Sequence, residues 1–116
     1  MEKWELDFNW LKIQHFVKDK FNKESLPKLE TVLFITGLQE LGKIPEDMTL
    51  EKKLDITTLG IYKVLSLGGY YEEIGRDKDG WPLWKELKPF EPANEQERQN
   101  ILKKYIIEYF ENKVNT

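Results

Sequence analysis

The segment YYEEIGRDKDGWPLWKEL, residues 70–87, decides the fold, because helical spacing ends there and a turn separates two aromatic-rich arms. The letters DKDG have the composition of a tight hairpin turn. Asp77 can accept hydrogen bonds from the turn backbone, while Lys78 and Asp79 fit the two central positions of a type I turn. Gly80 can adopt the left-handed conformation of a G1 bulge. These residues predict a β-hairpin over about residues 70–87.

The turn also predicts the strand register, because it places Asp77 opposite Trp81. One charge pair, one apolar pair and one like-charge conflict follow, namely Glu73–Lys85, Ile74–Trp84 and Glu72–Glu86. In this register the face expected to pack on the helices carries Tyr71, Trp81, Leu83 and Leu87. The opposite face carries Tyr70, Ile74 and Trp84. Pro82 fits a strand position whose N–H is not needed, on an exposed edge.

The same turn partly matches a calcium loop. An EF-hand loop needs oxygen ligands at positions 1, 3 and 5, glycine at 6 and glutamate at 12. Gly80 at position 6 puts Asp77 at 3 and Asp79 at 5, and Glu86 then falls at 12. Position 1 would be Gly75, which has no carboxylate. We therefore favour the hairpin and expect no calcium site.

The segment from Trp4 to Phe21 has helical spacing, but its apolar residues form two stripes when each residue turns the helix by about 100°. The first stripe consists of Leu6, Trp10, Ile13, Val17 and Phe21. The second consists of Trp4, Phe8 and Leu11, continued by His15. A helix of this kind is expected to need two apolar neighbours.

The next helix is predicted to begin after Ser25 as N-cap, with Pro27 in its first turn, where a missing N–H costs nothing. Its apolar residues cover nearly the whole circumference, which is typical of a central, buried helix. Gly42 provides the stop. Gly37 in its interior indicates a close crossing with another helix.

A third helix is predicted from Asp47 or Thr49 as cap to about Leu67. A break is left open at Asp55, itself a candidate cap before a β-branched run. The two glycines that follow end this helix.

The fourth helix opens at Asn94, with Glu97 in the position of a capping box. The predicted fold is therefore mainly α, with about four helices around one core and a single β-hairpin between the third and fourth helices. A chain of 116 residues fits a single domain over residues 1–116.

Composition limits the function classes. The net charge is −3, and the 18 basic residues include only two arginines, Arg76 and Arg98, so recognition of phosphate groups is poorly supplied and nucleic-acid binding is not expected. No apolar run is long enough for a signal peptide or a membrane span. Cysteine is absent, so disulfides and thiolate sites are excluded. We expect a cytoplasmic protein with no membrane association.

Catalytic constellations are not found. His15 is the only histidine, so a histidine metal cluster cannot form, and we interpret this residue as half-buried on its helix. Ser25 is better used as a helix cap, and Ser66 lacks the nucleophile-elbow pattern. We expect a protein that is not an enzyme and that has no cofactor and no catalytic or metal-binding residues.

The distribution of the 15 aromatic residues carries the functional hypothesis. Tryptophan is enriched in interface hot spots, although a small domain also uses large residues simply to fill its core. We predict a non-catalytic interaction or regulatory module that binds a protein partner or itself, as a homodimer through Trp4, Phe8 and Leu11. The whole predicted interaction surface consists of Trp4, Phe8, Leu11, His15, Tyr70, Ile74 and Trp84.

Two alternatives stay open. Helices followed by a hairpin are typical of winged-helix nucleic-acid-binding proteins, but Lys52, Lys53 and Lys63 are the only basic residues of the would-be recognition helix. The other alternative is a small-ligand pocket with Tyr62, Tyr105 or His15 as polar contacts.

Overall fold

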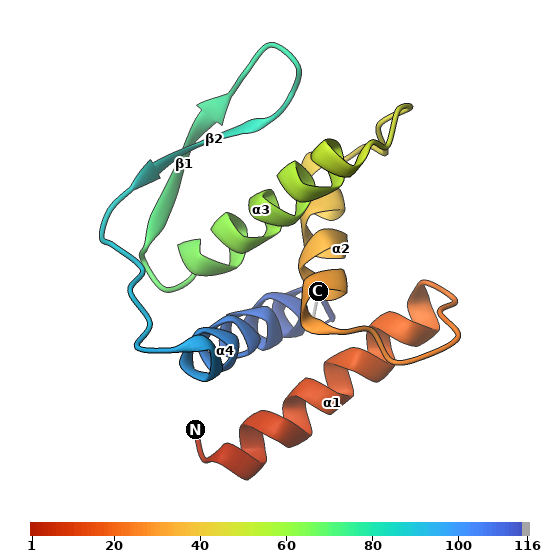
Figure 1. Ribbon diagram of the computed structural model, residues 1–116, viewed down its shortest axis with the longest axis vertical. Coiled ribbons are helices and arrows are strands. Elements are labelled where there is room, and N and C mark those ends of the chain that lie inside the picture. Colours follow the sequence, from red (N-terminus) through yellow and green to blue (C-terminus); the bar gives the residue numbers. More distant parts are fainter. Residues whose placement is uncertain (115–116) are drawn as a thin grey trace.

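A computed structural model describes residues 1–114 and contains four helices and one antiparallel hairpin (Figure 1). The predicted mainly α fold with the hairpin between the third and fourth helices is confirmed. No helix in this part of the chain is long and apolar enough to cross a membrane. The elements in order are α1 (Lys3–Lys20), α2 (Leu29–Leu41), α3 (Leu50–Ser66), β1 (Tyr71–Arg76), β2 (Pro82–Glu86) and α4 (Glu95–Val114).

The start of α2 differs from the prediction. The helix begins at Leu29, and its N-cap, Lys28, has extended backbone angles, so neither a Ser25 cap nor Pro27 in the first turn is found. The reason is a tertiary contact: Nε2 of Gln14 in α1 donates to the carbonyl oxygen of Pro27 at 2.9 Å. This bond fixes the connecting segment against α1, so the helix starts after it. The predicted stop at Gly42 is confirmed, with a left-handed φ of 78°.

Helix α3 is continuous through Asp55, so the break left open at that residue does not occur. The side chain of Thr49 caps the helix by accepting from the backbone N–H of Lys52 at 3.1 Å. The hydroxyl of Thr57 donates to the carbonyl oxygen of Lys53 at 2.9 Å, so this β-branched residue is accommodated inside the helix.

The predicted start of α4 is confirmed in position. Oδ1 of Asn94 accepts from the backbone N–H of Glu97 at 2.9 Å. The carboxylate of Glu97 reaches back to the backbone N–H of Ala93 at 2.7 Å, one residue before the donor that a standard capping box would use.

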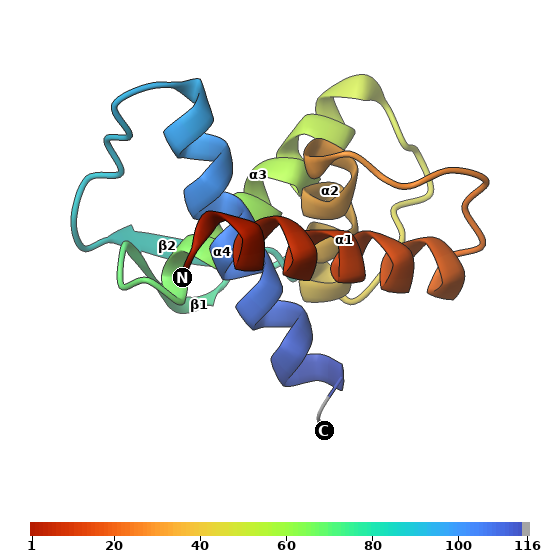
Figure 2. The same ribbon diagram turned by 90° about the horizontal axis from the view of Figure 1, so that it is seen from below.

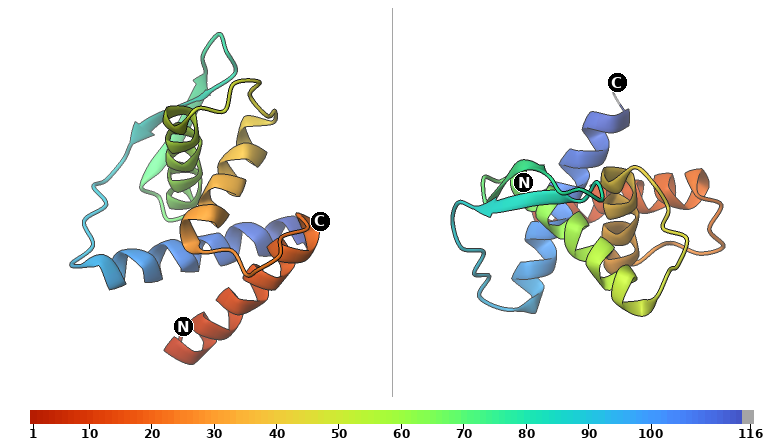
Figure 3. Two further views of the ribbon diagram at one scale, coloured as in Figure 1. Left: turned by 45° about the vertical axis from the view of Figure 1, so that its right-hand side comes forward. Right: turned by 90° about the horizontal axis from the view of Figure 1, so that it is seen from above.

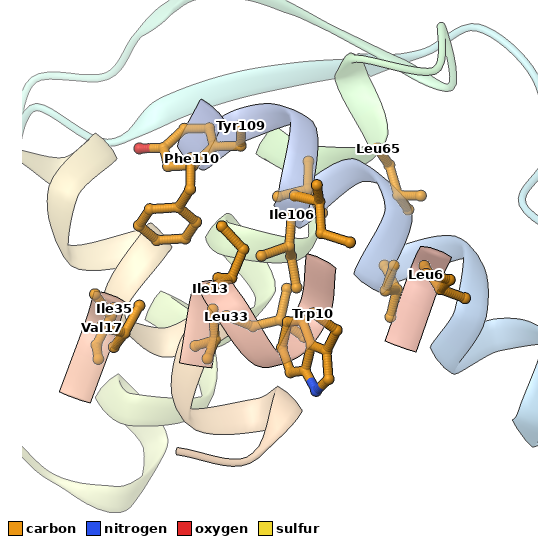
Figure 4. Packing of buried hydrophobic residues seen from close by; sticks show 14 residues of the cluster. Leu6, Trp10, Ile13, Val17, Leu33, Ile35, Leu65, Ile106, Tyr109 and Phe110 are labelled. Atoms are coloured by element: carbon orange, nitrogen blue, oxygen red, sulfur yellow. The ribbon is translucent and has the colours of Figure 1, made fainter. Parts of the chain in front are cut away.

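The main buried cluster lies where the inner face of α1 meets α2, α3 and α4 (Figure 4). Its most completely buried side chains include Val17, Leu33, Leu65, Leu102, Ile106 and Phe110. Figure 2 shows α1 crossing α4 at the outside of the molecule, so only one face of α1 can reach this core. A smaller cluster of Leu41, Ile56 and Leu59 lies under the hairpin and is covered by Trp81 and Trp84.

Helices α2 and α3 cross with their backbones in contact, as Gly37 predicted. A β-carbon added to Gly37 would collide with the carbonyl oxygen of Ile56, and one added to Gly60 would collide with that of Leu33. Glycine at these two positions therefore allows the close approach. Figure 3 shows the hairpin lying over α3, so α3 is enclosed between α2 and the hairpin.

The predicted hairpin turn is confirmed. The backbone N–H of Asp77 donates to the carbonyl oxygen of Trp81 at 2.9 Å, and that of Gly80 donates to the carbonyl oxygen of Asp77 at 3.0 Å. Oδ1 of Asp77 accepts from the N–H groups of Asp79 and Trp81, both at 2.9 Å. Gly80 has the expected left-handed conformation, with φ of 87°.

The predicted register holds only near the turn. Beyond Gly75, which pairs with Leu83, a bulge leaves Ile74 without a cross-strand partner. The pairs after the bulge are Glu73–Trp84, Glu72–Lys85 and Tyr71–Glu86, so the predicted pairs Glu73–Lys85, Ile74–Trp84 and Glu72–Glu86 are wrong. The inserted residue removes the like-charge pair Glu72–Glu86, which is favourable, while Lys85 keeps a glutamate opposite it, Glu72 in place of Glu73.

Candidate interaction surface

The two stripes of α1 have different fates. The inner stripe is buried in the main core at Leu6, Trp10, Ile13 and Val17, whereas its last member, Phe21, is 38% exposed. The outer stripe stays in solvent, with exposed fractions of 69% for Trp4, 57% for Phe8 and 43% for Leu11. His15, which continues this stripe, is exposed rather than half-buried. Within the described part of the chain, one apolar face of α1 is therefore covered by other helices and the second apolar face is not.

Charged side chains border the outer stripe. Nζ of Lys3 lies 3.4 Å from the carboxylate of Asp7, one helical turn further on. Nζ of Lys12 lies 5.7 Å from the centre of the Phe8 ring. Glu5 accepts from the backbone N–H of Glu2 at 3.4 Å and so helps to begin the helix. Charges of both signs thus surround an apolar centre, which is the usual anatomy of a protein interface.

The hairpin residues predicted to face a partner do not lie together. Ile74 is exposed, but Tyr70 packs on the main core, with its ring 5.4 Å from that of Phe90 and 6.4 Å from that of Tyr105. Trp84 is half-buried over the smaller cluster. Its Nε1–H is buried without an acceptor among residues 1–114, so packing rather than a hydrogen bond holds the ring.

The predicted assignment of the two hairpin faces is therefore wrong for β2. Pro82 is buried and Trp84 half-buried against the helices, while Leu83 is 45% and Leu87 51% exposed. Successive strand residues point to opposite faces, so one inward residue determines the others. Pro82 and Trp84 therefore lie on the face of β2 that meets the helices, and Leu83 lies on the opposite face.

The three polar residues proposed for a small-ligand pocket do not lie together, although Tyr62 lines a cavity between α3 and the hairpin without Tyr105 or His15. Tyr62 lies beside Tyr71, with ring centres 4.4 Å apart. Tyr105 packs near Tyr70 on the other side of the hairpin start, and His15 is on the outside of α1.

A partly buried polar contact links α2 to α4. The hydroxyl of Tyr109 donates to Oε2 of Glu40 at 2.7 Å and lies 3.2 Å from Oε1 of Gln39. Burial, together with the hydrogen bond to Glu40 and its negative charge, raises the pKa of Tyr109 far above its ordinary value. The other carboxylate oxygen of Glu40 lies 3.6 Å from Nζ of Lys63 in α3. We assign a structural role to this network because it joins three helices behind the hairpin.

Helix α3 is not presented as a recognition helix would be. It is enclosed between α2 and the hairpin, and Lys63, one of its three lysines, is engaged by Glu40. The structure thus offers no continuous basic face on this helix. Within residues 1–114, no group of three or more histidine, aspartate and glutamate side chains is arranged to hold a metal ion.

Comparison of the chain with protein-family models, with curated proteins and with solved structures finds no match.

Proposed function

We propose that this protein is a non-catalytic interaction module that self-associates through the outer stripe of α1. The observation that carries the proposal is the exposure of Trp4, Phe8 and Leu11 along one line of a helix whose opposite face is already buried. Large aromatic side chains aligned in this way are costly to leave in water and are typical of interface centres.

Self-association is favoured over a different partner by the charges along the stripe. Glu5 and Lys12 lie on the same edge of the outer stripe when α1 is drawn with 3.6 residues per turn. A twofold axis perpendicular to two antiparallel helices brings each edge against the same edge of the second copy. With Phe8 of one copy opposite Leu11 of the other, Glu5 falls within about 3 Å, along the axis, of the second copy's Lys12.

Because the dimer is symmetric, the contact between Glu5 of one copy and Lys12 of the other occurs twice. The same arrangement places Trp4 of each copy opposite His15 of the other. One helix of 18 residues is about 27 Å long, so the contact is smaller than a standard protein interface. We therefore expect a dimer with a dissociation constant in the micromolar range.

Sedimentation equilibrium over about 1 to 300 µM protein tests the proposal. The apparent mass should rise from 13.9 kDa toward twice that value with concentration. The double variant Trp4→Glu, Phe8→Glu should remain at the monomer mass at every concentration, with unchanged helical circular dichroism. Leu54→Glu is the matched control, because Leu54 is 59% exposed on a different helix, and this variant should still dimerise.

A monomer mass for the natural sequence at every concentration would refute self-association. If Leu54→Glu abolished the dimer as fully as the stripe variant, the contact would lie elsewhere.

A charge swap tests the antiparallel geometry separately. Glu5→Lys and Lys12→Glu should each weaken the dimer, because each places like charges together at two symmetric positions. The double swap Glu5→Lys, Lys12→Glu should restore most of the affinity. Absence of rescue would show that these two side chains do not meet across the interface.

A further inference from the structure

A second feature lies away from α1, where side chains of α3 and of the hairpin, the two elements seen together in Figure 3, line a common site. A cavity of about 270 Å³ opens there. The residues that give it its chemical character are Asp55, Tyr62, Asp77, Trp81 and Trp84. Asp55 and Tyr62 are two turns apart on α3, so they share one face of that helix, and the hairpin supplies the other three.

Aromatic rings form much of the cavity wall. The ring centres of Tyr62 and Trp84, which both line the cavity, are 6.2 Å apart and their planes meet at 62°, an edge-to-face contact between the two rings. Trp81 lines the same cavity from the turn. The face of an aromatic ring carries partial negative charge, and several such faces around one space attract a cation that is weakly hydrated.

The charged groups of the cavity are both acidic. Asp77 is held in place because its Oδ1 accepts from the backbone N–H groups of Asp79 and Trp81. Asp55 forms no ion pair with any residue in the described part of the chain. No lysine or arginine is among the described residues that line the cavity. Two carboxylates thus line the site, and the nearby Arg76 donates to the carbonyl oxygens of Gly80 and Glu40 rather than to either carboxylate.

We propose that this cavity binds an alkylated ammonium group. The aromatic walls suit the methyl groups, and the two carboxylates balance the positive charge. The volume lies just below the range of about 300 to 1,000 Å³ that holds whole drug-sized ligands, so it fits a head group rather than a large molecule. Such a group occurs in free quaternary ammonium compounds and in methylated lysine side chains. The proposal does not depend on dimer formation by α1.

Titration followed by NMR of the tryptophan indole N–H groups tests this site. Trp81→Phe and Trp84→Phe identify the two signals of the hairpin. The probes are choline chloride, its neutral isostere 3,3-dimethyl-1-butanol, and a short peptide carrying trimethyllysine beside the same peptide with unmodified lysine. Sodium chloride keeps the ionic strength equal throughout.

Choline or the trimethyllysine peptide should shift the Trp81 and Trp84 signals with saturation, and leave those of Trp4 and Trp10 unchanged. Saturation by choline alone indicates a free ligand, and saturation by the peptide alone indicates a modified side chain. The neutral isostere should bind about tenfold more weakly or not at all. Equal binding of the isostere, or no saturable shift with either cationic probe up to about 10 mM, would overturn the proposal.

Asp55→Asn tests the role of charge without disturbing the turn that Asp77 anchors. It should weaken binding of the cationic probe about three- to tenfold. Glu51→Gln is the matched control, since it removes the same charge one turn earlier on α3 from a residue that does not line the cavity. Equal affinities in the two variants would show that Asp55 does not contact the ligand and would contradict the assigned site.

Discussion

The backbone of Gly37 in α2 lies directly against the carbonyl group of Ile56 in α3. A backbone carbonyl cannot move aside as a flexible side chain can. Gly37→Ala should therefore force the two helices apart and lower the free energy of unfolding by about 2 to 3 kcal/mol, despite the better helix propensity of alanine. Urea unfolding followed by circular dichroism measures the change.

Gly42→Ala is the control for that measurement. Its left-handed backbone strains an alanine, but no atom lies within 4 Å of the added carbon, so the loss should be only about 1 kcal/mol. A Gly37→Ala variant no less stable than Gly42→Ala would show that the helix crossing can relax.

The raised pKa of Tyr109 predicts a loss of stability in alkali. The folded protein keeps this proton where the unfolded chain, with a tyrosine pKa of about 10, releases it. The unfolded state is thus favoured increasingly as the pH rises above about 10, and the contribution of Tyr109 to stability is fully present below that pH. In Tyr109→Phe this component should be missing, so its stability relative to the natural sequence should improve between pH 9 and about 11.

Urea unfolding at a series of pH values measures the difference in stability between Tyr109→Phe and the natural sequence. The lysines titrate in both proteins, so their contribution drops out of this difference. Tyr71→Phe is a suitable comparison. Its pKa is also raised, mainly by burial, but its hydroxyl lies 3.5 Å from Glu86 at an exposed site, so the effect should be smaller. A stability difference for Tyr109→Phe that does not change with pH would contradict the assigned cause.

Helix caps give a prediction in which sequence and structure disagree. Asn94→Ala removes the acceptor for the N–H of Glu97 and should cost about 1 kcal/mol. Ser25→Ala should cost less than about 0.5 kcal/mol, because Ser25 lies outside α2 and is exposed. Thermal unfolding of both variants distinguishes them. Equal losses would restore Ser25 as a functioning cap.

The hairpin turn depends on one carboxylate. Asp77→Ala removes the acceptor for two backbone N–H groups, those of Asp79 and Trp81, and should destabilise the protein by about 1 to 2 kcal/mol. Lys78→Ala, next to it in the exposed turn, should change stability by less than about 0.5 kcal/mol. Tryptophan fluorescence during urea unfolding reports both, and a loss with Lys78→Ala as large as that with Asp77→Ala would be inconsistent with this role.

Features set by neighbouring residues were predictable from the sequence. Gly42, Thr49 and Asn94 end or begin helices where local chemistry places them, and the turn at Asp77 has the expected form. Features set by distant residues were not. The start of α2 depends on Gln14, which is 13 residues away from Pro27 in the sequence.

The bulge at Ile74 had one local sign, a glycine within a strand. Gly75 has φ of 142°, a conformation that other residues rarely adopt, and its position next to the unpaired residue fits the known use of strand glycines at bulges. A turn-based register cannot reveal such an insertion, because it assumes unbroken pairing. The error then carried through to every pair beyond it.

The candidate surface was predictable only in part. The spacing of Trp4, Phe8 and Leu11 defines a stripe, but helical periodicity does not tell which of two stripes a neighbouring helix will cover. That choice depends on the crossing of α1 over α4. The placement of Trp84 likewise depends on the smaller cluster beneath it, which α2 and α3 build together.

The proline in β2 has a consequence for uncontrolled assembly. Along an antiparallel pair of strands, residue pairs that share backbone hydrogen bonds alternate with pairs that do not. Asp77 and Trp81 are hydrogen-bonded, so the next pair, Arg76 and Pro82, is not. The backbone nitrogen of Pro82, which carries no hydrogen, therefore faces away from β1. On the other strand, the kink at Ile74 twists the free edge of β1. Both outer borders of this small sheet are thus poor templates for a further strand, which protects the hairpin against fibril-like stacking.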